Sequence, residues 1–491
     1  RQVGKSHGHV CHVFVTGTVW KPEGGDIKAE WLVINVERAE EPLGSISLTS
    51  PDVVAIRMRG AKEVAEFVTV MNGRAYLERG GKDNIQRARA IFRPLAQRSG
   101  PVSSYLGYAS GVVASFLSGR ERLSALAEAE GAYRRSIALA GDDDKRWRAT
   151  LQNNLGEVLT MEADQERAQA RLEKLSEAER AFRDALRLRT YESAPQDYAE
   201  TQANLGVAIC EHAAPFFADY RRKRLAEAEQ AFREALRVRA RDRDSRGYAV
   251  IQNDLGTLFL NQAVQMAGDA RMGKLLEAER ALREALRVLT RGSTPRDCAT
   301  VQGSLGAVLH SQAAQLAGPA QVKKLAEAER VFREALRMSA DKAMPSVHAG
   351  IQNNLGALVM NQAELLAGEA RRRKLAEGEQ LLRSALLVST CDAYPVSYAT
   401  AQSNLGSLLV LQAEQLEGEA RQQRLDEAER AFREALHIFT MSAFPIKHVQ
   451  LVEFLRRIGK TYKEQWHMGR MVRVQDSGLL AGGLRHSEKS L

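Results

Sequence analysis

The chain has 491 residues with 44% hydrophobic side chains, enough to bury a core, but only 6% aromatic residues, which favours helices packed through alanine and leucine over sheets rich in large rings. Its net charge of +9 is small for this length. Because most arginines stand beside glutamates in predicted helices, the charge indicates a solvated, salt-bridged face rather than a surface for nucleic acid or a membrane. No stretch reaches the roughly 18 apolar residues of a membrane span.

The cysteines and the first residue bear on the cellular setting. Cys11, Cys210, Cys298 and Cys391 lie far apart and form no CxxC pair, which predicts reduced thiols and a cytoplasmic location. Because the sequence opens on Arg1 instead of methionine, we expect it to be a piece of a longer protein.

Residues 1–60 have a composition of their own. Two β-branched, partly alternating stretches, 10–20 and 27–38, flank a turn-forming KPEGGD segment. This pattern predicts a small β-hairpin, which is stable only as part of a larger sheet or α/β segment.

A group of metal-ligand types lies at the start of the chain. His7, His9 and Cys11 would share one face of a strand, and His12 follows them, so these side chains could hold Zn²⁺. No distant Cys/His pair supplies the second half of a structural site. We therefore expect no metal and a solvated chain end.

Internal repeats with a period of 50 residues dominate the rest of the sequence. A Gln-x-x-Leu-Gly phrase begins at Gln152, Gln202, Gln252, Gln302, Gln352 and Gln402. A second phrase, rich in Ala, Glu and Arg, begins at Leu175, Leu225, Leu275, Leu325, Leu375 and Leu425. Chance cannot hold two phrases in register over six copies, so the fold is a repeat array.

Both phrases have helical periodicity. In the second, Leu225, Ala228, Phe232 and Ala235 fall three and four residues apart and share one face. Each unit is therefore predicted to be two antiparallel helices of roughly 18–20 residues. We name them helix A, with the Leu-Gly phrase, and helix B, with the second phrase. Glu229 and Arg233, four residues apart, are expected on the outer face of helix B.

Glycine and proline recur at fixed places between the phrases. One glycine per unit is expected to end helix A in a left-handed C-terminal cap. These glycines are Gly268, Gly318, Gly368 and Gly418. One proline is expected in the first turn of the next helix A. These prolines are Pro195, Pro295, Pro345, Pro395 and Pro445.

The order Leu205-Gly206, then Ala228, Phe232 and Ala235, resembles the signature of the tetratricopeptide repeat (TPR) family. The resemblance implies an all-α, right-handed superhelical solenoid of antiparallel helix pairs, preceded by the small N-terminal hairpin. In this family helix A lines the concave surface. The period of 50 instead of about 34 residues marks a long-period, bacterial-type variant with longer helices and a wider superhelix. Gln replaces the family's usual aromatic three residues before the Leu-Gly pair.

We expect the array to cover residues 61–446 in about eight units, seven long and one shorter. A solenoid must cover its last apolar face, so residues 447–468 are expected to form a capping helix. Residues 469–491 are basic, glycine-rich and without periodicity, and we expect a disordered tail.

Two sets of positions on helix A are candidates for function. An asparagine column lies just before the Leu-Gly pair, at Asn154, Asn204, Asn354 and Asn404. A regular column indicates a repeated structural need, so we expect these side chains to hydrogen-bond to neighbouring helices and hold the stacked units together. The alternative is that they hydrogen-bond to the backbone of a bound peptide. Positions that vary between units suit specificity better. The predicted partner-binding residues are Glu211, Asn261, His310, Met360 and Asn361, expected to form one exposed stripe on the inner surface.

No catalytic or cofactor-binding motif is present in the sequence, so we expect a binding protein without a cofactor rather than an enzyme. The leading hypothesis is a scaffold that binds a partner peptide or helix in the concave groove. One alternative is the sensor or regulatory region of a larger bacterial signalling protein, linked to an ATPase or a protease. An RNA-binding array is a weaker alternative, because the varied positions include few stacking side chains. The sequence leaves the partner and the oligomeric state open.

Overall fold

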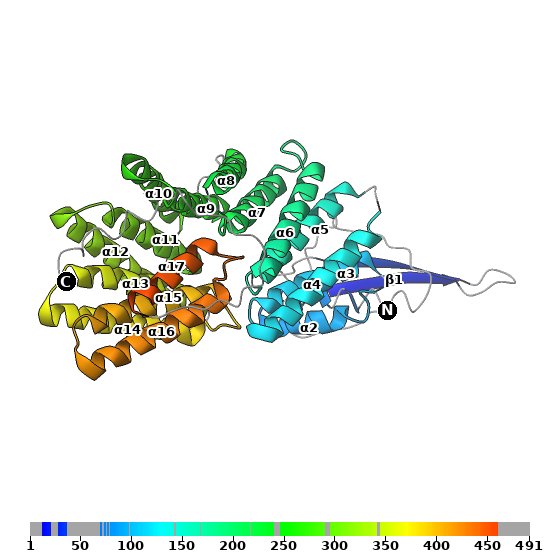
Figure 1. Cartoon of the computed structure of the whole chain (residues 1–491). Helices are drawn as coiled ribbons and strands as arrows, with labels where there is room; N and C mark the ends of the chain where they lie inside the picture. Colours follow the sequence, from blue (N-terminus) through cyan, green and yellow to red (C-terminus); the bar gives the residue numbers. More distant parts are fainter. Residues whose placement is uncertain are drawn as a thin grey trace. The chain divides into compact units, whose positions relative to one another are not determined.

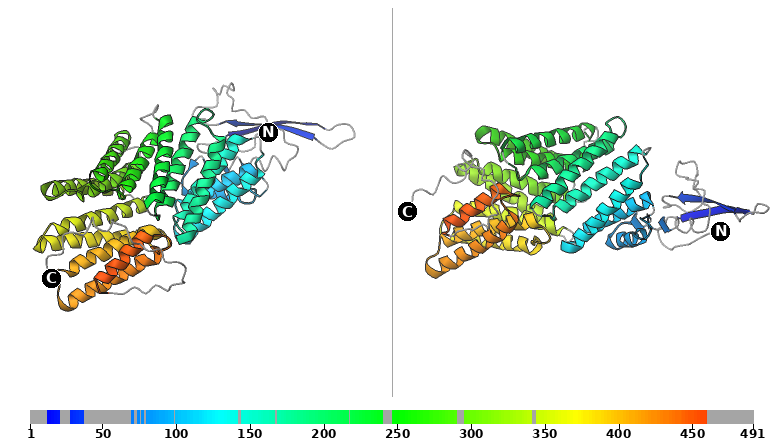
Figure 2. Two further views of the ribbon diagram at one scale, coloured as in Figure 1. Left: turned by 45° about the horizontal axis from the view of Figure 1, so that its top comes forward. Right: turned by 45° about the vertical axis from the view of Figure 1, so that its right-hand side comes forward.

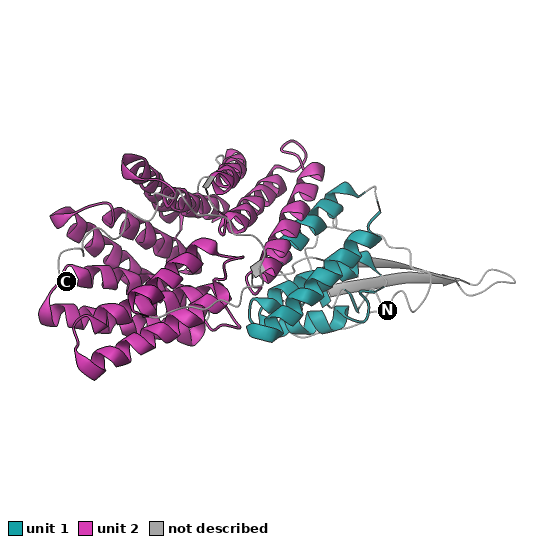
Figure 3. Cartoon of the chain, viewed as in Figure 1, with its two compact units in different colours: residues 1–158 teal, residues 159–491 magenta. Residues whose placement is uncertain are grey.

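The computed structural model describes residues 12–20, 28–36, 69–70, 73–74, 76–77, 79–97, 99–141, 144–166, 168–216, 218–239, 246–289, 295–340 and 344–459. These residues contain two strands and sixteen helices, labelled α2 to α17 (Figure 1). The chain divides into two compact units, unit 1 at residues 1–158 and unit 2 at residues 159–491 (Figure 3). No helix of the described residues is both long and apolar enough to cross a bilayer.

Unit 1 begins with the expected hairpin. Strands β1 (His12–Trp20) and β2 (Lys28–Val36) pair antiparallel, with Val15 opposite Val33. Four residues near the start of the sequence were considered as possible metal ligands. Three of them, His7, His9 and Cys11, lie outside the described residues.

The helices of unit 1 form a short stretch of array. They are α2 (Lys82–Phe92), α3 (Gly100–Ala114), α4 (Gly119–Leu139) and the beginning of α5 (Lys145–Ala163), which ends in unit 2. Phe92, Leu106 and Ala132 meet in a buried cluster. Helix α3 packs along α4. Before this pair, a Cβ added at Gly73 would lie 2.6 Å from the Phe92 ring.

Unit 2 is a helical solenoid of antiparallel helix pairs, as the sequence predicts. Its remaining helices are α6 (Ala168–Leu188), α7 (Pro195–Ala213), α8 (Ala218–Arg239), α9 (Arg246–Ala263), α10 (Gly268–Val288), α11 (Pro295–Ala313), α12 (Gly318–Met338), α13 (Pro345–Glu364), α14 (Gly368–Val388), α15 (Pro395–Ala413), α16 (Gly418–Ile438) and α17 (Pro445–Arg457). Odd-numbered helices from α3 to α15 are helices A, and even-numbered helices from α4 to α16 are helices B. Each helix A from α7 to α15 packs along the helix B that follows it, and the pairs stack one after another (Figure 2).

The signature residues lie at the contact between helices A and B. Leu205, Gly206, Ala228, Phe232 and Ala235 are all buried. A Cβ added at Gly206 would lie 2.7 Å from the Phe232 ring, so only glycine allows this ring to reach the backbone of helix A. The small residue therefore sets how closely the two helices approach.

The prolines begin helices A as expected, but the glycine column lies elsewhere than predicted. Helix α9 ends at Ala263, where the last turn closes with hydrogen bonds from Gln265 N to Gln262 O and from Met266 N to Ala263 O, both 3.1 Å. Gly268, with φ of +54°, is instead the first residue of α10. The left-handed conformation thus turns the chain into helix B rather than ending helix A.

Helix α17 packs on α16 at the end of the described chain. Leu451 and Leu455 are buried, and Phe454 stacks on Phe432 with ring centroids 5.4 Å apart. Residues 460–491, including the predicted tail and the end of the predicted capping helix, lie outside the described residues.

Candidate functional site on helices A

Successive helices A of unit 2 lie closer to one another than successive helices B. Helix α9 contacts α7 and α11, and α13 contacts α11 and α15, whereas no two helices B within the described part of unit 2 pack comparably. Hairpins that approach more closely at one edge must stack with curvature toward that edge. The helices A therefore lie on the inner, concave side of unit 2.

One line of positions on each helix A stays accessible. In α9 and the residue after it, this line is Val250, Asp254, Thr257, Asn261 and Val264. The spacing of four and three residues keeps the side chains on one face of the helix. We name this line, with its equivalents fifty residues apart in α7, α11, α13 and α15, the inner stripe. Each of its residues is exposed or half-buried.

The inner stripe carries acidic but no basic side chains. Its carboxylates are Glu200, Glu211, Asp254, Glu364 and Glu414, and no Lys or Arg stands at any of its positions. The remaining side chains are small, amide, hydroxyl or aliphatic. This composition contrasts with the net charge of +9 for the whole chain, so the basic residues lie elsewhere.

The predicted partner-binding residues do not form one exposed stripe. His310 on α11 and Asn361 on α13 are half-buried and face each other across two units, with Asn361 Nδ2 donating to His310 Nε2 at 2.8 Å. Met360 packs against the hydrophobic core of the next unit. The expectation that Asn361 is exposed is therefore wrong, because its amide contacts His310 of the neighbouring helix A. Glu211, Asn261 and Asn361 lie on the inner stripe, whereas His310 and Met360 each stand one residue before a stripe position.

Glu211 lies in a crowded polar cluster. Arg171 Nη2 on α6 donates to its Oε2 at 3.0 Å, and Asp164 receives a hydrogen bond from the same arginine at 3.4 Å. Burial raises the pKa of Glu211 to about 7, with Asp164 adding repulsion and Arg171 opposing both. The pKa of this carboxyl group is therefore above the ordinary value of a glutamate.

The asparagine column contacts neighbouring units. Asn404 Nδ2 on α15 donates to Asn353 Oδ1 on α13 at 2.9 Å. Asp254 interrupts the column in α9, and burial raises its pKa to about 6 despite the hydrogen bond from Asn253. The contact between Asn404 and Asn353 is the kind that the stacking interpretation predicts.

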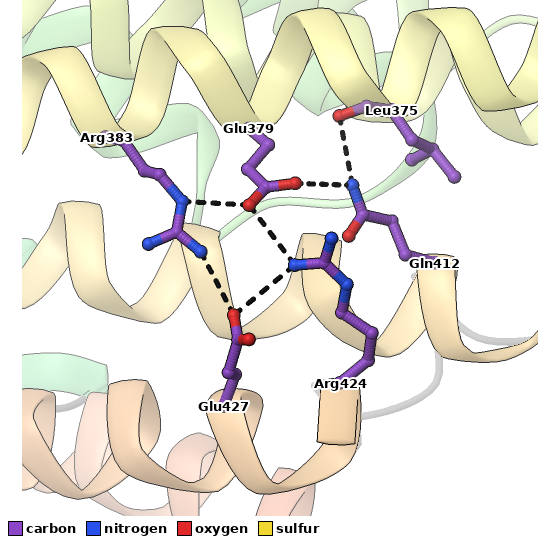
Figure 4. Close-up of polar contacts among 6 residues, drawn as sticks. All are labelled: Leu375, Glu379, Arg383, Gln412, Arg424 and Glu427. Carbon is purple, nitrogen blue, oxygen red and sulfur yellow. Dashed lines mark hydrogen bonds and ion pairs between the residues drawn. The ribbon is translucent and has the colours of Figure 1, made fainter. Parts of the chain in front are cut away.

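A polar network joins neighbouring units (Figure 4). The sequence did not lead us to predict it. Glu379 on helix B accepts from Gln412 Nε2 of the next helix A at 2.9 Å, and from Arg383 Nε on its own helix at 2.8 Å. Arg424 of the next helix B donates to the same carboxylate at 3.3 Å. Arg383 also bonds Glu427 of that next helix at 3.0 Å. One carboxylate thus joins three helices of two units.

The same network recurs in other units, and it shows that Glu229 does not lie on the outer face as expected. Glu229, expected on the outer face, accepts from Gln262 Nε2 at 2.9 Å, and its side chain is only 16% exposed. In α6, Glu179 meets His212 in place of the glutamine, at 2.6 Å. Burial alone would raise the pKa of Glu179, but hydrogen bonds from His212 and Arg224 outweigh it and lower this pKa to about 2. The sequence signal for this network was a glutamate followed 33 residues later by a glutamine in four successive units.

No protein-family model and no curated protein matches the chain. Solved structures that resemble it include the human IFIT1 dimer with PPP-AAAA, 14% identical over 76% of this chain and 72% of that chain, with a TM-score of 0.38. BtubC from P. vanneervenii is 19% identical over 53% of this chain and 89% of its own, with a TM-score of 0.36. A Rap protein complexed with Competence and Sporulation Factor is 10% identical over 82% and 99%, with a TM-score of 0.40. Similarity at this level does not indicate which ligand this chain binds.

Proposed function

We propose that the chain is a TPR-type interaction scaffold, in which the concave side of unit 2 holds an extended segment or a helix of a partner protein. The observation that supports this most is the close contact of successive helices A, which leaves the inner stripe continuous over five units. A long, shallow surface with varied small and polar side chains suits a ligand without a compact fold of its own.

The charge of the inner stripe indicates the kind of partner. RNA binding relies on Lys and Arg contacts with phosphates, and the stripe has carboxylates instead. Two of these carboxylates already have arginine partners, Glu211 with Arg171 and Glu414 with Arg371 at 2.8 Å. The surface is therefore only mildly acidic, and a neutral or weakly basic protein segment fits it best.

We assign the array to a long-period TPR variant because the signature residues Leu205, Gly206, Ala228, Phe232 and Ala235 lie at the contact between helices A and B. A cytoplasmic signalling chain of bacterial type, without enzymatic activity of its own, is the setting that we propose for such a scaffold.

A pair of matched substitutions tests the concave side. Ala307→Arg places a long cation on the inner stripe of α11, and Ala326→Arg places the same side chain on the exposed face of α12 in the same hairpin. Partners captured by the native chain are identified by mass spectrometry and then titrated as purified peptides by calorimetry. We expect Ala307→Arg to weaken binding by about tenfold or more, as a substitution within an interface core does, and Ala326→Arg to leave it unchanged.

Two outcomes would contradict the proposal. Equal binding by both variants would place the partner surface elsewhere. A complex with RNA whose affinity falls steeply with salt and is changed by Ala307→Arg but not by Ala326→Arg would replace the protein partner with a nucleic acid.

A further inference from the structure

Unit 1 contains a pocket of about 440 Å³ in which aromatic side chains converge. Tyr105 and Tyr108 come from α3, Trp147 and Asn154 from α5, and Arg74 from the segment before α2. A volume of a few hundred Å³ is typical of sites that hold a small ligand or a few residues of a peptide.

The repeat itself does not require these aromatics. Tyr105 stands immediately before the Leu-Gly pair of α3, where helices A of unit 2 have Asn, Asp or Ser. Tyr108 immediately follows that pair, where they have Val, Thr, Ala or Ser. Trp147 stands eight residues before Leu155, where they have Asp, Gly, Val or Ser. In a chain with 6% aromatic residues, three departures of the same kind at one pocket indicate a local role.

The surrounding structure holds the rings in place. At the start of α5 the backbone N–H of Trp147 donates a hydrogen bond to Asp144 Oδ1 at 2.9 Å. A Cβ added at Gly100 would lie 2.9 Å from Trp147 Cη2, so glycine lets the indole lie against the start of α3. The Arg74 guanidinium lies 5.6 Å from the Tyr105 ring centroid. Tyr108, in contrast, is 51% exposed and presents its ring to solvent.

The polar groups of the pocket are mainly hydrogen-bond donors. Ser104 Oγ and Thr150 Oγ1 donate to carbonyls of their own helices, at 2.7 and 3.1 Å. The tyrosine hydroxyls, the indole N–H and the Arg74 guanidinium can each donate a hydrogen bond to a ligand, whereas Asn154 Nδ2 donates to the Tyr133 hydroxyl at 3.5 Å. None of the residues that line the pocket is acidic. A fitting ligand therefore has apolar rings and acceptors, and few donors.

We propose that this pocket binds a proline-rich protein segment in the extended polyproline II conformation. Proline supplies a ring that packs flat on tyrosine and tryptophan, and a carbonyl acceptor without an N–H donor. A polyproline II backbone leaves its carbonyls outside any internal hydrogen bond, so they are available to the donors of the pocket. A lysine-like cation has no carboxylate partner here, and a single arginine is a poor match for a phosphate backbone.

The test uses the full chain and a fluorescein-labelled, C-terminally amidated decaproline peptide, followed by fluorescence anisotropy. A Gly-Ser peptide of equal length and a ten-nucleotide oligoadenylate are the comparison probes. We expect decaproline to bind in the micromolar range, and Tyr108→Ala to weaken it by about tenfold, as removal of an aromatic anchor does. Tyr108→Phe keeps the ring and should retain most of the affinity.

A matched control is available on the other unit. Tyr220 on α8 is 47% exposed, similar to Tyr108, and lies outside the pocket. Tyr220→Ala should leave decaproline binding unchanged. Circular dichroism melts of Tyr108→Ala establish that the variant is folded.

Three results would overturn the inference. These are the absence of decaproline binding at millimolar peptide, equal affinity for the Gly-Ser peptide, and preferential binding of oligoadenylate that depends on Tyr108. The outcome is separate from that for the concave side of unit 2, because Ala307→Arg should not change decaproline binding and Tyr108→Ala should not change binding to the inner stripe.

Discussion

Glu379 on α14 accepts a hydrogen bond from Gln412 on α15 at 2.9 Å, and the same pair joins one hairpin to the next along unit 2. The equivalent pairs are Glu229 with Gln262, Glu279 with Gln312, and Glu329 with Gln362, at 2.8 to 2.9 Å. Gln412 also donates to the Leu375 carbonyl at 3.5 Å. Burial would raise the pKa of Glu379, but hydrogen bonds from Gln412 and Arg383 outweigh it and lower this pKa. The charged carboxylate is thus the form that joins the units.

Removing this carboxylate should loosen the array. Glu379→Ala leaves Gln412, Arg383 and Arg424 without their shared acceptor, and we expect a loss of ~1–3 kcal/mol in the free energy of unfolding. Glu369→Ala on the same helix removes a glutamate whose side chain is 59% exposed, and should change stability by less than ~0.5 kcal/mol. Urea melts of both variants measure the difference. Equal effects would show that the network contributes no more than a surface pair.

Asp254 should make stability depend on pH in the direction opposite to an ordinary carboxylate. Because its pKa is raised to about 6, the folded state retains the proton that the unfolded state releases near pH 4. Stability from this group is therefore present at low pH and is lost as pH rises from about 4 to 6. Asp254→Asn removes the charge and restores the amide that other units have at this position. We expect the variant to melt higher than the native chain at pH 8.

The comparison at two pH values is decisive. At pH 4 the native Asp254 is protonated and resembles the amide, so the difference in melting temperature should nearly vanish. A gain of equal size at pH 4 and pH 8 would mean that burial of the charge is not the cause. Asn354→Asp, the reverse change in α13, should lower the melting temperature at pH 8.

The glycine of the Leu-Gly pair should be intolerant of the smallest substitution. In Gly206→Ala the new Cβ would lie 2.7 Å from the Phe232 ring, and forced repacking costs ~1–3 kcal/mol. Gly350 lies in α13 with no atom within 4 Å of an added Cβ, so Gly350→Ala should stabilise the helix by ~0.4–1 kcal/mol. A lower melting temperature for Gly206→Ala and a higher one for Gly350→Ala would support the contact between Gly206 and Phe232. Two changes of the same sign would argue against it.

The periodic part of the fold could be predicted from the sequence, because apolar residues at spacings of three and four determine which faces are buried. Leu205 and Phe232 are buried as that pattern requires. The contacts between units could not be predicted in the same way. Asn361 faces His310 only because of the angle at which α13 packs on α11, and one sequence period carries no information on that angle. The aromatic pocket likewise joins Arg74 to Trp147 across several elements.

His310 provides a test of the contact between α11 and α13. Burial lowers the pKa of His310 to about 4, so the folded state holds the neutral ring, whose Nε2 can accept from Asn361. The unfolded state binds a proton near pH 6.5. The contribution of His310 to the free energy of unfolding is therefore fully present above pH 6.5 and is lost as pH falls from there toward 4.

His310→Gln keeps a polar group toward Asn361 but does not titrate, so the variant should lose less stability than the native chain between pH 7.5 and pH 5. His437 on α16 is exposed, and His437→Gln should follow the native pH profile. Melts at both pH values give the result, and identical profiles for all three proteins would show that burial of His310 does not lower its pKa.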